Sequence, residues 1–490
     1  MRAQAVDQLA LLPLYAAAGT AVLVLLADLL VGRRAVTIGT LAAGGLATVI
    51  CAIVTGDRTG TFCDPNGSAC SWVPSPLAAT AAVVFAALTV GVLALSVPSL
   101  RLGTAPAGEF CFLLAASMTG GVVVGYAGDL ITLIVGLETL TLPLYLLVGL
   151  RRFAPGERVT TSAAAASVTF FLISVISTAV ALLGAALNYA ATGALHFDRL
   201  IPGAGLTAPV ADVGVGLLVI GLAFKVAAVP LHAWAPPTYD GAPLPVAAYL
   251  STASKLGGVL ALAAIVTRLD AAVLTAVLAI LTMTVGNLVA LRQTRMVRLL
   301  AWSSIAQAGY ILAPLALGAD GVEAAAAYAV FFVVLEFIAF AVVVALRPAG
   351  ADGGDLASYR GAGRRSPWLG AALVLSLAGL AGLPPGLAGL FAKVTIVEAL
   401  VDHGQTWLAV IVALNAVIAL AYYLRVAALL YATPQQVGIP VADPTLLEAA
   451  MHPRRPVTRP VAAALITAVA VAVALGFAPQ LLFDALSRAS

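Results

Sequence analysis

The amino-acid sequence predicts an all-α polytopic membrane protein, because it is strongly hydrophobic, poor in charge and divided into long apolar segments. Of its 490 residues, 62% are hydrophobic and 10% are charged, whereas an average soluble protein has about 25% charged residues. The mean hydropathy is +1.07. Most of such a chain is solvated by lipid or by other membrane helices. This excludes a disordered chain, a nucleic-acid-binding protein and a secreted disulfide scaffold.

Apolar segments long enough to cross a bilayer, which takes about 20 residues in a helix, follow one another along the whole chain. We expect about fourteen transmembrane helices, joined by loops too short to hold a soluble domain. The first segment is longer than the hydrophobic region of a signal peptide, so we expect it to be retained. The fourteen segments are residues 9–31, 35–56, 76–97, 108–126, 129–149, 162–189, 210–230, 244–267, 271–291, 299–318, 323–346, 368–401, 406–431 and 461–482.

The placement of arginine predicts how these helices are oriented, because loops on the inner side of a membrane are enriched in basic residues. With fourteen helices, 16 arginines fall on one side of the membrane, five fall on the other and Arg425 lies within a segment. We therefore expect the arginine-rich side to face inwards and both termini to lie outside.

All three lysines of the chain lie within apolar segments, together with a few carboxylates. A charge near the centre of a membrane helix costs about 2.5–3.5 kcal/mol on insertion scales, so such residues are functional candidates by default. Lysine suits proton transfer because a buried ammonium group can lose its proton, whereas arginine stays charged. We predict a proton relay of Glu138, Lys225, Lys255 and Lys393, with His232 close enough to the first two lysines to take part. The alternative is that each lysine makes a structural ion pair or a hydrogen bond at a helix end.

Two further carboxylates, Asp28 and Glu336, also lie within apolar segments. Neither adjoins a helix interruption. We therefore expect them to make helix-packing or interfacial contacts.

Prolines beside two of the lysines predict interrupted helices. Pro230 follows Lys225 by five residues, and Pro384 and Pro385 precede Lys393. Proline removes a backbone hydrogen bond, and non-helical backbone at membrane depth survives only where it lines a cavity or is buried in protein. Interrupted helices with a charge nearby are typical of ion pathways in transporters.

The two interrupted segments also predict an internal repeat. They lie five segments apart and run in opposite directions across the membrane, and their lysines are 168 positions apart. This arrangement favours two inverted five-helix repeats, formed by segments 4–8 and 9–13, a common transporter plan. We expect one integral membrane domain made of an N-terminal three-helix part, the two repeats and a C-terminal loop with the last helix, at residues 1–106, 107–268, 269–432 and 433–490.

Cys63 and Cys70 bracket a Pro-Asn-Gly turn sequence in a loop that we expect outside, where disulfides are permitted. We predict a disulfide between them, the alternative being two unpaired loop thiols. Cys51 and Cys111 lie within apolar segments and are expected to act as small hydrophobic residues. We expect no strands, hence no dinucleotide or phosphate fingerprint after a strand, and no metal, haem or iron–sulfur ligand set. The chain alone should therefore carry no redox centre.

Five stretches make the chain recognisable. It resembles the antiporter-like membrane subunits of bacterial respiratory complex I, the NADH–quinone oxidoreductase, and among them most closely the subunit N family. The stretches are GLETLTLPLYLLVGLRR (136–152), FKVAAVPLHAWAPPTYDGAPLPVAAYLSTASKLG (224–257), RQTRMVRLLAWSSIAQAGYIL (292–312), GLPPGLAGLFAKVTIVEA (382–399) and NAVIALAYYLRV (415–426).

This resemblance implies one proton channel of a redox-driven translocase in the bacterial plasma membrane. NADH, FMN, iron–sulfur clusters and quinone would then belong to partner subunits, with no cofactor in this chain. The partners implied are the other membrane and peripheral subunits of the complex, the lipid bilayer and protons, and no nucleic acid. The alternatives are a subunit of a multisubunit sodium/proton antiporter, a structural subunit with impaired pumping, and a hydrogenase-type membrane complex.

The resemblance also implies roles for single residues. Glu138 matches the family's glutamate on helix 5, Lys225 the lysine on broken helix 7, Lys255 the lysine on helix 8 and Lys393 the lysine on broken helix 12. Family members usually carry a helix-6 lysine that faces the glutamate, and alignment places Thr169 at that position. We therefore expect the glutamate to lack this partner within the chain.

Overall fold

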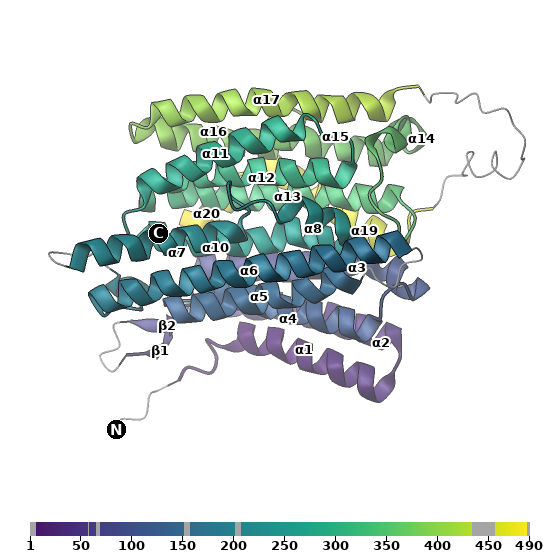
Figure 1. Ribbon diagram of the computed structural model, residues 1–490. Coiled ribbons are helices and arrows are strands. Elements are labelled where there is room, and N and C mark those ends of the chain that lie inside the picture. The colour runs from purple at the N-terminus through teal and green to yellow at the C-terminus, as the bar shows by residue number, and fades with distance from the viewer. Residues whose placement is uncertain are drawn as a thin grey trace, which may run out of the picture.

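The computed structural model describes residues 6–56, 58–64, 69–150, 157–200, 207–433 and 456–487. The described chain is almost entirely helical, which confirms the predicted fold class. Figure 1 shows the helices lying largely side by side, with α1 and α2 at one edge of the bundle and α17 at the other. Most of the predicted C-terminal loop, residues 434–455, lies outside the described residues.

Twelve helical runs among the described residues are long and apolar enough to cross a membrane. The two other predicted segments correspond to α12 (Met296–Leu315) and to the pair α15 (Pro367–Ala381) and α16 (Leu387–Asp402). The twelve runs are α1 (Leu12–Val31), α2 (Arg34–Thr55), α3 (Pro76–Leu102), α4 (Ala107–Tyr126), α5 (Leu130–Gly149), α6 (Glu157–Thr192), α7 (Ala208–Lys225), α9 (Leu244–Tyr249) continued by α10 (Lys255–Val266), α11 (Ala272–Ala290), α13 (Val322–Leu346), α17 (Thr406–Tyr431) and α19 (Arg459–Phe477). The chain continues into a short α20 (Gln480–Ser487).

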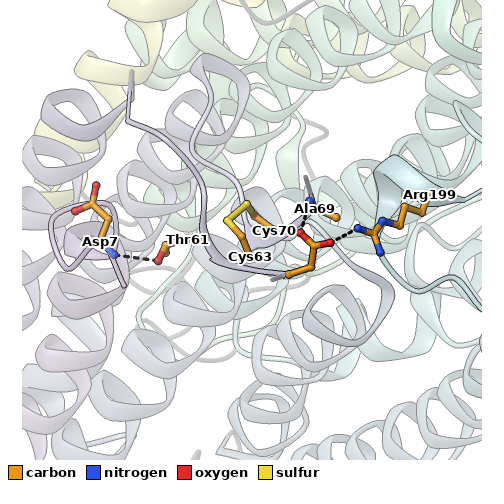
Figure 2. The surroundings of a disulfide bond; sticks show 7 residues. Asp7, Thr61, Cys63, Ala69, Cys70 and Arg199 are labelled. Atoms are coloured by element: carbon orange, nitrogen blue, oxygen red, sulfur yellow. Dashed lines mark hydrogen bonds and ion pairs between the residues drawn. A yellow bond between two sulfur atoms is a disulfide. The ribbon is translucent and has the colours of Figure 1, made fainter. Parts of the chain in front are cut away.

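The expectation of a chain without strands is wrong at one place. Strands β1 (Thr61–Cys63) and β2 (Cys70–Trp72) pair antiparallel, with Cys63 opposite Cys70. In the structure these two cysteines form a disulfide across the hairpin (Figure 2). Each strand has only three residues, which is too short for the alternation that reveals a strand in a sequence.

The disulfide hairpin ties together three parts of the chain at one end of the bundle. The indole of Trp72 stacks on Tyr126 at the end of α4, with ring centroids 4.5 Å apart, and donates a hydrogen bond of 2.9 Å to the carbonyl of Ala10 before α1. Asp64, next to Cys63, forms an ion pair with Arg199, which follows α6 and is labelled in Figure 2. The hairpin therefore fixes the ends of α1, α4 and α6 relative to one another.

The two predicted helix interruptions are present. The first begins in buried backbone at Val226–Val229, whereas Leu383, Pro384 and Pro385 of the second are exposed. Helix α7 ends at Lys225, and the chain runs irregularly to the short helix α8 (Ala235–Gly241). Within this stretch, the N–H of Val229 donates to the hydroxyl of Thr282 on α11 at 2.9 Å, because no helical carbonyl is available. The second interruption separates α15 from α16. Both contain a cis X-Pro peptide, before Pro230 and before Pro385.

Helix α13 lies in the middle of the bundle (Figure 1) and packs against α3, α9, α10, α12, α15, α16 and α19. Facing it, α9 and α10 are joined by one π-helical turn, Leu250–Ser254. Single π turns inside α-helices are frequent at functional sites. This turn ends directly before Lys255 and so sets the position of that side chain.

Candidate functional site

Lys225 and Glu138 form an ion pair inside the bundle. The Nζ atom of Lys225, at the end of α7, lies 2.7 Å from Oε1 of Glu138 on α5. The same ammonium group donates to the hydroxyls of Ser174 at 3.0 Å and Thr141 at 3.3 Å, so its three donors are all used. The lysine side chain is 4% exposed and the carboxylate side chain 28%. The pair is therefore buried at its lysine end and more open at its carboxylate end.

On α6, the hydroxyl partner of Glu138 is Thr178 and not Thr169, the position that alignment gives to the family's lysine. The hydroxyl of Thr178 donates to Oε1 of Glu138 at 2.5 Å, whereas Thr169 is exposed on the outside of α6. The carboxylate thus has two partners within the chain, Thr178 and Lys225. No charged residue of α6 reaches it among the described residues, because the sequence between Arg158 and Asp198 holds none.

Lys255 lies on α10, which packs against α7, the helix that ends at Lys225. It is the first residue of α10, its side chain is 1% exposed, and its Nζ atom has no hydrogen-bond partner among the described residues. Gly258, one turn later, faces α7: a Cβ atom added there would lie 3.0 Å from the Cβ of Lys225. The close approach of α7 and α10 at this glycine brings the two buried lysines onto adjoining helix faces.

Lys393 lies after the second interruption and bonds to the end of the helix before it. Its Nζ donates to the carbonyls of Leu380 at 3.0 Å and Ala381 at 2.8 Å, two of the last carbonyls of α15. A helix leaves such carbonyls without internal partners. The ammonium group also lies 4.8 Å from the centroid of the Tyr310 ring, and the side chain is 7% exposed. Lys225 lies on the helix before the first interruption, whereas Lys393 lies on the helix after the second.

A chain of uncharged polar groups leads from the middle of the bundle to Lys393. The amide of Gln307 donates to the carbonyl of Leu380 at 3.0 Å and to the hydroxyl of Tyr423 at 3.1 Å. That hydroxyl is 2.5 Å from the Oγ of Ser303, one turn before Gln307 on α12. Sequence reasoning missed these residues, although Ser303 and Gln307 are four positions apart, a spacing that places them on one helix face.

A groove of about 680 Å³ opens beside Lys393 between α16 and α17. Its lining includes Glu398 and Asp402, which follow the lysine along α16 towards the end of that helix. Both carboxylates are exposed. The groove therefore connects the buried ammonium group with the surface, and its lining is apolar apart from Lys393 and these two carboxylates.

His232 lies in the irregular stretch after α7, where its ring packs at 5.1 Å from the ring of Trp302. Among the described residues, no hydrogen bond joins it to Lys225 or Lys255. The structure therefore does not bring this predicted participant into the network of the lysines. No group of three or more His, Cys, Asp or Glu side chains in the described part of the chain is placed to hold a metal ion.

On the side of the membrane with many arginines, Arg295 holds α8 to the start of α12. It donates from two nitrogens to the carboxylate of Asp240 at 2.9–3.1 Å and reaches Asp352 at 2.8 Å. Burial by itself lowers the pKa of Arg295, but these hydrogen bonds raise its pKa well above the usual value. The cluster anchors the short helix that follows the first interruption.

The family of membrane domains described as "NADH:quinone oxidoreductase/Mrp antiporter, TM" matches residues 127–419, which include all four residues of the predicted relay. The chain belongs to this family. One relative, named "NADH-quinone oxidoreductase subunit N", from Salinispora tropica, is 58% identical over 99% of both chains. The predicted resemblance to subunit N is thereby confirmed.

Solved structures agree with this assignment. A chain of respiratory complex I from Thermus thermophilus matches 98% of this chain and 100% of its own length, with a TM-score of 0.80 and 28% identity. A chain of the Mrp complex from Dietzia sp. matches with a TM-score of 0.79 but only 22% identity, which shows a shared fold and no more.

Proposed function

We propose that this chain is the subunit N of a bacterial NADH–quinone oxidoreductase and that it moves protons through Glu138, Lys225, Lys255 and Lys393. The observation that carries the proposal is the ion pair of Lys225 with Glu138, buried beside a helix interruption. Redox chemistry is assigned to partner subunits. The residues of this chain hold a proton, release it and shield it from bulk water.

The ion pair acts as the switch. While Glu138 accepts from Lys225 at 2.7 Å, the ammonium form is stabilised and the proton is held. If a charge change in a neighbouring subunit draws the carboxylate away, the ammonium group is left buried and unpaired, which is strongly unfavourable. The neutral amine is then preferred, and the proton leaves towards Lys255 on the adjoining helix.

The exit step uses the second interruption. A proton that arrives at the amine of Lys393 forms an ammonium group held by the carbonyls of Leu380 and Ala381. From there, the groove along α16 leads past Glu398 and Asp402 to the surface. We place this surface outside and the arginine-rich side inside, with both termini outside. Labelling of a single cysteine introduced at Thr59 by a membrane-impermeant reagent in intact cells tests that orientation, and complete protection would overturn it.

The relay is tested by exchanging Lys225→Ala and Lys393→Ala in the assembled complex. Redox-driven proton uptake into vesicles and NADH oxidation are measured together. We expect each exchange to lower the number of protons taken up per electron, with the peripheral subunits still bound. An unchanged ratio in both variants would show that the chain is a structural subunit.

A further inference from the structure

Glu336 is a buried carboxylate that the relay described so far does not use. It lies in the middle of α13, where it is the only charged residue between Glu323 and Arg347. Its side chain is 0% exposed, and among the described residues neither carboxylate oxygen has a hydrogen-bond partner. A packing contact, as the sequence suggests, does not explain such a group, because burying an unpartnered carboxylate is unfavourable.

The nearest charge of opposite sign is Lys255. The two groups interact electrostatically, and the Nζ of Lys255 is likewise without a hydrogen-bond partner among the described residues. Helix α13 packs against both α10 and the π-helical turn that ends before Lys255. An acid and a base, both buried and both without a hydrogen-bond partner among the described residues, thus lie on adjoining helices and interact electrostatically.

Glu336 also interacts electrostatically with Tyr423 of α17. The hydroxyl of Tyr423 contacts Ser303 and receives the amide of Gln307, which also bonds to the carbonyl of Leu380. That carbonyl is one of the two acceptors of Lys393. Glu336 therefore interacts both with Lys255 and with a member of the polar chain that leads to Lys393.

We propose that Glu336 is a further proton-carrying residue, which takes the proton from Lys255 and passes it on towards Lys393. The ammonium group of Lys255 becomes a neutral amine as the carboxylate of Glu336 becomes a carboxylic acid. When the acid gives its proton to the hydroxyl of Tyr423 while that hydroxyl releases its own proton towards the amine of Lys393, the carboxylate is restored and the hydroxyl is unchanged. This inference rests on the proposed function, because it adds a step to the same relay.

The test compares Glu336→Gln with Glu323→Gln in the assembled complex. Gln keeps the shape of the side chain but cannot carry a proton between an acid and a base. Glu323 is the matched control, since it is the same residue on the same helix but exposed in the first turn. We expect Glu336→Gln to lower proton uptake per electron as much as Lys225→Ala does, and Glu323→Gln to match the unaltered complex.

The outcomes separate the inference from the proposed function. If Glu336→Gln pumps normally while Lys225→Ala does not, the inference is wrong and the function stands. If both variants pump normally, both are wrong. Should Glu336→Gln fail to assemble, Glu336→Asp and Glu336→Asn repeat the comparison with smaller side chains, and equal pumping by these two would overturn the inference. If Glu336 only packed against its neighbours, the acid variant and the amide variant would pump protons equally.

Discussion

The hydroxyl of Thr178 and the ammonium group of Lys225 donate to the same oxygen of Glu138, at 2.5 Å and 2.7 Å. The two donors come from α6 and α7, so the carboxylate is held from two helices at once. A threonine thus supports the carboxylate from the helix on which the family usually has a lysine.

We predict that Thr178→Val lowers the number of protons taken up per electron. A hydrogen bond to a charged group contributes about 1.5–3 kcal/mol, so its loss should shift the balance between the paired and unpaired states of Glu138 by roughly tenfold or more. Proton uptake per electron is measured in vesicles. Thr169→Val is the control, because this threonine is exposed on the same helix. Equal pumping by the two variants would contradict the role given to Thr178.

The second prediction concerns Gly382, which has a φ of +82° and lies against the stem of Lys393. A Cβ atom at this position would lie 2.6 Å from the Cδ of Lys393, so Gly382→Ala should displace the ammonium group from its two carbonyls. We expect a loss of pumping close to that of Lys393→Ala.

Gly404→Ala separates displacement from backbone strain. Gly404 also has a positive φ, +76°, but no atom lies within 4 Å of the position of a Cβ there. Strain alone would affect both variants. If Gly404→Ala reduces pumping as much as Gly382→Ala, the contact with Lys393 is not the cause.

The disulfide gives the third prediction. Alkylation of the unfolded, unreduced chain should modify Cys51 and Cys111, the two free cysteines, and leave Cys63 and Cys70 unmodified. In the chain-entropy description, a loop of this length contributes about 2–3 kcal/mol. We therefore expect Cys63→Ala to increase hydrogen exchange in β1 and β2, and Cys51→Ala to leave it unchanged. Alkylation of all four cysteines would show that the bond is absent.

The fourth prediction concerns the cluster at Arg295. Asp240→Asn should destabilise the complex by about 1 kcal/mol, a figure reduced for partial exposure. Asp355→Asn should change it less, because Asp355 is 3.9 Å from Arg295 and 68% exposed. Thermal inactivation of NADH oxidation measures both. A larger loss of stability in Asp355→Asn than in Asp240→Asn would contradict these contacts of Arg295.

This stabilisation should not vary with pH over the working range. The folded-state pKa of Arg295 is raised, so its contribution is fully present below the unfolded-state pKa, itself far above neutral pH, and is lost only as the pH rises through the folded value. The difference between Asp240→Asn and the unaltered complex should therefore be the same at pH 6 and at pH 8.5. A difference that disappears at pH 8.5 would be inconsistent with a permanently charged arginine.

The sequence predicted the helices and the depth of the charges, because apolar length and intramembrane charge are properties of single segments. It did not predict which residue of α6 meets Glu138. Thr169 and Thr178 are nine positions apart, about two and a half helical turns, and so point to opposite faces. Helix α6 has no charge within the membrane to mark its inner face, so an alignment alone could not choose between them.

Contacts between distant segments were equally hidden. Ser303, Gln307 and Tyr423 are uncharged residues in apolar helices, and only the folded chain shows that they meet. Glu336 was visible as a charge. Only the folded chain shows that its carboxylate lacks a hydrogen-bond partner, because the neighbouring helices α10 and α17 come from other parts of the sequence.

The three lysines are all buried, with exposed fractions of 4%, 1% and 7%. They are also the only lysines in the chain. The folded subunit therefore offers no buried-relay amine to solvent when the relay is closed. A lysine of this subunit that an amine-reactive reagent modifies during turnover must therefore have been opened to water by the catalytic cycle.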